Sequence, residues 1–174
     1  MNKPIIMPFD GKSPVVSPLA YVAPGAALIG DIEIGEDTSI WFGVVIRADI
    51  NAVRIGKRVS IQDGSILHVN FGDAAVIVGD DVTVGHQVVL HGCRLESGCL
   101  VGIGARVLDY VVVGSGSIVA AGSVVREHTK IPPGELWAGV PAVKKRELSA
   151  DEREGLIAHA AGYVKLCRAF REVA

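Results

Sequence analysis

Aliphatic residues recur at every sixth position through most of the chain. The period runs without interruption from Val16 to Ile46 and again from Leu95 to Val125, with two shifted segments in between. A period of six fits neither a helix nor a plain alternating strand. It is typical of short strands that each end in a turn, three to a coil, with aliphatic side chains stacked in ladders inside a prism. Residues 16–130 are therefore predicted to form an all-β solenoid.

The segments on either side lack this period. Residues 1–15 are rich in proline and polar residues and are interpreted as an irregular lead-in. Residues 131–149 carry proline and glycine turn signals, which predict a connecting loop. Ser149 and Glu152 then form a capping-box pattern, and apolar residues follow at helical spacing. Residues 150–171 are predicted to be one amphipathic α-helix packed on the solenoid.

Composition agrees with short strands and narrows the possible partners. Hydrophobic residues make up 49% of the chain but aromatic residues only 5%, and 21 glycines punctuate it, which favours strands of small branched residues. The formal net charge is −2 without a basic patch, so we expect no nucleic-acid partner. No apolar stretch reaches the roughly 18–20 residues of a membrane span, and none resembles a signal peptide. The odd count of 3 cysteines fits a reducing compartment, so we expect a cytoplasmic protein without a membrane partner.

Polar side chains gather between Trp41 and His91, and three of the histidines lie there. The six-residue period places His68 and His91 on the same face, one coil apart, with Cα atoms about 5 Å from each other. His86 lies around a corner, on the next face. Three-fold packing of prisms would bring the corner of one subunit against the face of its neighbour. The sequence therefore predicts a homotrimer in which one metal ion is shared by these three histidines.

Further polar residues accompany the histidines. Gln62 and Asp63 share the face of the corner histidine, whereas Arg47 and Asp49 share the face of the other two. Three neutral imidazoles around an open position are typical of catalytic zinc, which lowers the pKa of bound water to about 7 and yields a hydroxide nucleophile. Fe2+ or Co2+ would suit the same ligands. Gln62 can orient the hydroxide, and Arg47 can pair with Asp49 or Asp63 and tie subunits together.

Five short motifs resemble the γ-class carbonic anhydrases, in particular their short bacterial branch among the hexapeptide-repeat proteins. The motifs lie at residues 41–49, 61–64, 67–68, 84–86 and 90–93. The resemblance implies a left-handed parallel β-helix, a trimer and the zinc-dependent, reversible hydration of CO2 to bicarbonate. It also implies roles for named residues. These are His68, His86 and His91 as metal ligands, Gln62 as the residue that positions the hydroxide, and Arg47, Asp49 and Asp63 as a network that supports the ligands and joins subunits.

Other positions match or depart from the same family. Tyr163, on the expected terminal helix, matches a tyrosine that the short relatives place near the metal, and is a further candidate catalytic residue. Ile50 stands where the archetypal enzyme has its proton-shuttle glutamate, and the loop after the first histidine keeps a single carboxylate, Asp73. Asp73 or buffer could take up the proton instead. His128 and His159 lack comparable partners and are expected to be surface residues.

Two other functions stay open. Hexapeptide-repeat proteins include acyltransferases and acyl-CoA thioesterases, and some related trimers act as metal-stabilised scaffolds with little catalysis. The matched histidines disfavour an ordinary acyltransferase, because such enzymes usually rely on a single catalytic histidine and need no metal site. A metal-bound hydroxide could still attack a thioester. Carbonic anhydrase activity is the function predicted here.

Overall fold

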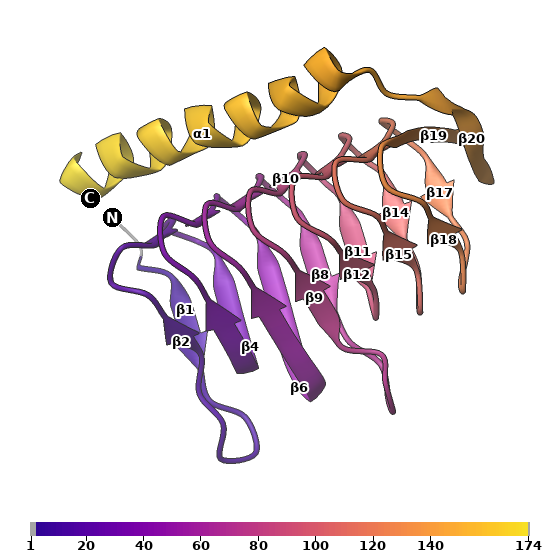
Figure 1. The fold of residues 1–174 in the computed structure, drawn as a ribbon. Coiled ribbons are helices and arrows are strands. Elements are labelled where there is room, and N and C mark those ends of the chain that lie inside the picture. The colour runs from indigo at the N-terminus through magenta and orange to yellow at the C-terminus, as the bar shows by residue number, and fades with distance from the viewer. Residues whose placement is uncertain (1–2, 174) are drawn as a thin grey trace.

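The chain forms a left-handed parallel β-helix of about 7 turns, and a long helix runs along one of its sides (Figure 1). The computed structural model describes residues 3–173. Each coil contributes a strand to each of three faces, and a turn separates successive strands. The fold predicted from the six-residue period is confirmed.

Parallel pairing defines three faces, which we call the first, second and third face. The first face consists of β1 (Ile5–Met7), the first halves of β4 (Ala27–Ile34) and β6 (Val45–Ile55), β8 (Ile66–His68), β11 (Val89–His91), β14 (Arg106–Val107) and β17 (Val124–Val125). The second face consists of β2 (Val15–Val16), the second halves of β4 and β6, β9 (Val76–Val78), β12 (Arg94–Leu95), β15 (Val112–Val113) and β18 (Lys130–Ile131). The strands β4 and β6 are long because each continues from the first face onto the second.

The third face carries the helix. It consists of β3 (Tyr21–Val22), β5 (Ser39–Ile40), β7 (Ser60–Ile61), β10 (Thr83–Val84), β13 (Leu100–Val101), β16 (Ile118–Val119), β19 (Glu135–Gly139) and β20 (Ala142–Glu147). The pairs along this face are parallel, except that β19 and β20 form an antiparallel hairpin.

The interior consists of aliphatic ladders in register. On the first face Ile46, Leu67, Leu90 and Val107 stack on one another, and each is fully buried. Each such side chain stabilises the fold by about 1.5–3 kcal/mol relative to exposure. Glycine often follows a ladder position because the coils approach closely there. At Gly85 an added Cβ would lie 2.8 Å from the backbone nitrogen of Ile103 in the next coil.

The helix α1 (Ala150–Val173) begins with the predicted capping box. The Ser149 backbone N–H donates to Glu152 Oε2 at 2.9 Å, and the Glu152 backbone N–H donates to Ser149 Oγ at 3.1 Å. These bonds satisfy amide groups that would otherwise lack a partner at the start of the helix. Its buried side chains, among them Ala160 and Cys167, face the third face of the solenoid. No helix within residues 3–173 is both long enough and apolar enough to span a membrane.

Two expectations for the flanking segments were wrong. The predicted connecting loop over 131–149 contains the whole β19–β20 hairpin, because only the prolines interrupt pairing while Glu135–Gly139 continues the ladder beside β16. The predicted irregular lead-in over 1–15 includes β1, whose residues pair with the first half of β4. Both segments thus add terminal strands to the faces formed by the periodic core.

Candidate metal and active site

Two of the predicted ligands lie side by side on the first face. His68 ends β8, His91 ends β11, and the strand register pairs the two residues directly. Their ring centroids are 5.0 Å apart, and His68 Nδ1 lies 3.0 Å from His91 Nε2. The stacking expected from the six-residue period is confirmed.

A carboxylate holds the opposite nitrogen of each ring. His68 Nε2 lies 3.1 Å from Asp49 Oδ1, and His91 Nδ1 lies 2.6 Å from Asp109 Oδ1. An imidazole N–H that donates to a carboxylate leaves the other ring nitrogen with a free lone pair. In the neutral rings the two nitrogens that face each other at 3.0 Å are then both acceptors, and a cation between them would relieve their repulsion.

This donor set fits a divalent metal ion. Tetrahedral zinc with Zn–N distances of about 2.0–2.1 Å separates two nitrogen ligands by roughly 3.3–3.4 Å. The observed 3.0 Å is a few tenths of an ångström shorter, so a small rotation of the rings would accommodate the ion. The carboxylates that orient both rings are of the kind that accompanies metal-bound histidine.

The electrostatics around His68 keep its imidazole available as a ligand. Burial lowers the pKa of His68, as do Arg47 and His91, while Asp49 opposes this shift. Burial would raise the pKa of Asp49, but hydrogen bonds from its own backbone, from Arg47 and from His68 outweigh burial and lower it. Asp49 is therefore a charged acceptor at neutral pH and His68 is a neutral donor. Arg47 forms an ion pair with Asp49, which is one of the two pairings expected from the sequence.

The third predicted ligand lies on the other side of the corner. His86 follows β10 and its Nδ1 lies 2.9 Å from Asp63 Oδ2, one coil below. Gln62, beside Asp63, is only 4% exposed. The predicted grouping of His86 with Gln62 and Asp63 is therefore observed. These three side chains line a cavity of about 270 Å3, whose remaining walls are Trp41, Phe42, Tyr163, Leu166 and Phe170.

Tyr163 belongs to this cavity although it lies far from the other site residues in the sequence. It stands on α1, and its ring centroid lies 6.4 Å from that of Trp41. Trp41 in turn donates its indole N–H to Ser60 Oγ at 3.0 Å. The helix thus closes one side of the cavity with an aromatic wall.

A single chain assembles the candidate ligands as two separate half-sites. The first is the His68–His91 pair on the first face, and the second is His86 with Gln62 and Asp63. Within residues 3–173, no group of three or more His, Cys, Asp or Glu side chains lies close enough to hold one metal ion.

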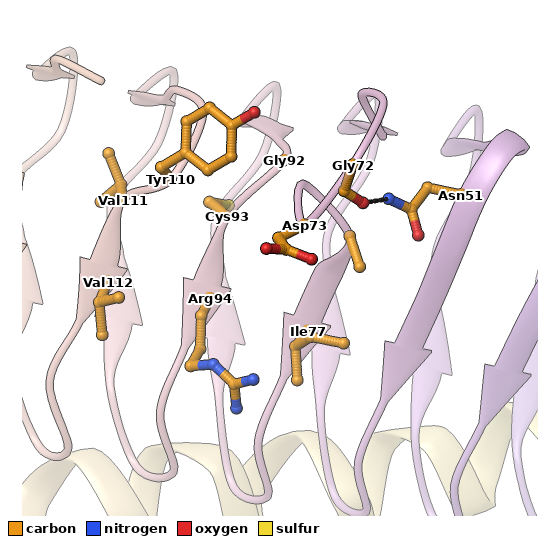
Figure 2. Close-up of a pocket in the computed structure, with 11 residues that line it drawn as sticks. Asn51, Gly72, Asp73, Ile77, Gly92, Cys93, Arg94, Tyr110, Val111 and Val112 are labelled. Carbon is orange, nitrogen blue, oxygen red and sulfur yellow. Dashed lines mark hydrogen bonds between the residues drawn. The ribbon is translucent and has the colours of Figure 1, made fainter. Parts of the chain in front are cut away.

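A larger cavity of about 490 Å3 lies on the second face and contains none of the predicted site residues (Figure 2). Asn51 braces its rim by donating to the carbonyl oxygens of Gly72 at 2.7 Å and of Asn70 at 3.0 Å. Asp73, a candidate proton acceptor in the sequence, projects into this cavity beside Arg94 and Tyr110. Its carboxylate is therefore placed away from the cavity that contains Gln62 and His86.

Relatives with known names identify the family of the chain. A carbonic anhydrase from Geobacillus kaustophilus is 45% identical over 148 residues, which cover 85% of this chain and 81% of that protein. The chain belongs to the γ-class carbonic anhydrase family. The mitochondrial γ carbonic anhydrase 1 of Arabidopsis thaliana is 45% identical over 166 residues, which cover 92% of this chain. The matching region spans 60% of the plant protein. The family predicted from the motifs is thus confirmed, although no family model matches the chain.

Solved structures of this family's fold include close matches. A Bacillus cereus protein, provisionally described as an acetyltransferase, superposes with a TM-score of 0.97 at 38% identity and covers 99% of this chain and 100% of its own. A hexapeptide transferase family protein from Anaplasma phagocytophilum gives 0.92 at 37% identity and covers 95% of this chain and 98% of its own.

The candidate residues named from the sequence did not include Asp109, which contacts His91, or the residue that donates to Asp109. Asn70 donates to Asp109 Oδ2 at 3.0 Å, while Asp109 Oδ1 holds His91. The signal was present, because β11 pairs with β14 in a register that places Leu90 beside Val107. Counting two residues onward from each puts Asp109 beside Gly92, at the edge of the imidazole of His91.

Proposed function

We propose that the chain catalyses the reversible hydration of CO2 to bicarbonate at zinc sites shared between the subunits of a homotrimer. The observation that carries this proposal is the His68–His91 pair, whose lone-pair nitrogens face each other at 3.0 Å while carboxylates hold their other nitrogens. Family membership supports the same activity. His86 of a neighbouring subunit would supply the third ligand.

The residues that would hold the metal are His68, His86 and His91. When bound, zinc would supply a Lewis acid that makes water a competent nucleophile at neutral pH. Fe2+ and Co2+ remain alternatives to zinc with the same ligands. Asp49 and Asp109 keep the proton on the outer nitrogen of each first-face imidazole, and the Asp63 carboxylate lies 2.9 Å from Nδ1 of His86.

The cavity beside His86 is suited to bind CO2 and to orient the attacking water. Its walls are mostly aromatic and aliphatic, which suits an apolar molecule such as CO2 and limits competing water. The buried amide of Gln62 is placed to orient the attacking water by hydrogen bonding. Attack of this water on the carbon of CO2 forms bicarbonate and releases one proton. Tyr163 borders the same space and would contact the substrate.

The trimer is supported by the surface around the paired histidines. Val45 and Ile66 are 36% and 45% exposed on the first face, in the same strand pair as Arg47 and His68. Exposed aliphatic side chains beside a charged cluster are typical of an interface with an apolar centre and a polar margin. Packing of a corner against this face would bring the two half-sites together. Arg47 and Asp63 would then lie near the same seam.

Mixing of variants tests the shared site. His86→Ala and His68→Ala should each lose metal and CO2 hydration, measured by elemental analysis and stopped-flow indicator assay. When the two variants are unfolded, mixed equally and reassembled, about one quarter of the interfaces would regain all three histidines. Recovery of about a quarter of wild-type activity and metal content is expected. A site contained within one chain would give no recovery, and that result would refute the sharing of ligands.

Transfer or hydrolysis of an acyl thioester is the competing function, and the description of the Bacillus cereus relative as an acetyltransferase favours the transfer. The same purified protein, loaded with zinc, should be assayed against acetyl-CoA with and without an amine acceptor. Turnover of the thioester without CO2 hydration would replace the proposal with this alternative. Bound metal without either activity would favour the trimeric scaffold.

A further inference from the structure

The proton released by hydration needs an acceptor near the cavity of Gln62 and His86. Asp63 lines this cavity, but its carboxylate is held by His86 at 2.9 Å. Asp73 lies in the cavity on the second face instead. The structure offers another base on the helix that closes the first cavity.

His159 lies one helical turn before Tyr163 on α1. The two rings are in edge-to-face contact, with centroids 5.2 Å apart and an interplanar angle of 76°. On the outer side of Tyr163, a depression of about 410 Å3 is lined by Ala158, His159, Gly162, Tyr163 and Leu166. Tyr163 and Leu166 line both this depression and the cavity of Gln62 and His86. Tyr163 thus contacts His159 and also lines the cavity of Gln62 and His86.

Thr83 holds the imidazole of His159 in place. His159 Nδ1 lies 3.3 Å from Thr83 Oγ1, a buried hydroxyl on β10 that lies three residues before His86. Thr83 from the solenoid and Tyr163 from the helix both contact the ring. Within residues 3–173, His159 forms no ion pair with a carboxylate, so none competes for its proton. The residue is otherwise exposed, which leaves Nε2 open to solvent.

We propose that His159 relays protons from the active site to the solvent; this inference rests on the function proposed above. The water that attacks CO2 gives up one proton, which passes through water beside Tyr163 to Nε2 of His159. The imidazolium that forms then gives this proton to a buffer base, and His159 returns to its neutral state. Imidazole suits this role because it ordinarily gains and loses protons near neutral pH.

His159→Ala in the metal-loaded trimer tests the relay. In low concentrations of a bulky buffer, kcat for CO2 hydration should fall roughly tenfold or more, because general acid–base groups contribute about 100-fold or more. kcat/KM should stay within about twofold of wild type, since CO2 attack precedes the relay. Added imidazole should restore kcat by replacing the missing side chain. His128→Ala is the matched control, because His128 is also exposed but stacks on Tyr110 elsewhere on the solenoid, and it should change neither constant.

Three outcomes would overturn the relay. An unchanged kcat of the His159→Ala variant in low buffer would show that protons leave by another route. An equal fall in kcat and kcat/KM without rescue by imidazole would indicate a structural role for the residue. Absence of hydration by the metal-loaded wild-type protein would refute the proposed function, and the relay with it. If the wild-type enzyme is active and the His159→Ala variant is unaffected, only the relay is refuted.

Discussion

The hydrogen bond between His91 and Asp109 provides the sharpest test of the metal site, because one substitution can replace a single carboxylate oxygen of Asp109 with nitrogen. In Asp109→Asn one carboxylate oxygen becomes an NH2 group. Asp109 now accepts from His91 Nδ1 at 2.6 Å and from Asn70 Nδ2 at 3.0 Å. An amide can accept from only one of these donors. It must either present its NH2 to the NH2 of Asn70 or turn and present it to His91.

Each orientation of the new amide costs metal affinity. If the NH2 group faces His91, Nδ1 must act as acceptor, the ring proton moves to Nε2, and the ligand lone pair is lost. If it faces Asn70, two donors meet and the ring orientation loosens. Loss of such a partner typically lowers metal affinity by about 10–100-fold, or about 1.4–2.7 kcal/mol. We expect an effect in this range in zinc competition with a chromogenic chelator.

A second substitution should reverse much of the loss. In Asn70→Asp/Asp109→Asn the amide can accept from His91 and donate to the new carboxylate, so every polar group regains a partner. Asp73→Asn is the control, because that carboxylate lines the cavity on the second face. Zinc affinity of Asp109→Asn within about twofold of wild type would refute the proposed support of His91. Failure of the double variant to recover would show that charge, rather than hydrogen-bond polarity, is what the site requires.

The remaining predictions concern the scaffold. Leu90→Ala should lower the free energy of unfolding by about 3–5 kcal/mol in urea titrations, because Leu90 is fully buried within a continuous ladder. Gly85→Ala should destabilise the fold because its Cβ would lie 2.8 Å from a backbone nitrogen, whereas Gly155→Ala, with nothing within 4 Å, should stabilise the helix by roughly 0.5–1 kcal/mol. Arg168→Ala should lower the free energy of unfolding only slightly, because Arg168 is 60% exposed in its pair with Asp37 and solvent screens the pair. The hydrogen bond from Arg168 lowers the pKa of Asp37, so this difference should be fully present above the unfolded-state pKa of about 3.9 and disappear as the pH falls through the folded-state value. A difference that persists at the lowest pH would contradict this assignment.

The six-residue period made the arrangement of the faces predictable. Each coil repeats the same three strands, so one interior position assigns its neighbours to a face. The pairing of Leu67 with Leu90 then places His68 beside His91, and that of Ile61 with Val84 places Asp63 near His86. Interior packing and parallel pairing determine these positions together, and both are visible in the sequence.

Contacts between side chains across a turn, and strands that lie where the six-residue period breaks, were harder to predict from the sequence. Asp109 contacts His91 through a turn, where the outward position has no hydrophobic signal. The β19–β20 hairpin was missed because prolines hid strands that continue the third face. The orientation of the helix was equally hidden. Its capping box gave its start, but only packing shows that Tyr163 lines the cavity and that His159 contacts the ring of Tyr163.

Because the two half-sites lie on different faces of the chain, metal binding and subunit assembly would depend on each other. A prism with flat faces cannot converge three outward side chains on one point, because residues on adjacent faces diverge at the corner. The chain holds two imidazoles with their lone pairs opposed at 3.0 Å, which is unfavourable until a cation joins them. That ion would still lack its third protein ligand in one chain, since His86 is held by Asp63 around the corner. Metal binding and subunit contact would therefore stabilise each other, and removal of the ion by a chelator should weaken the assembly at the concentration at which activity is lost.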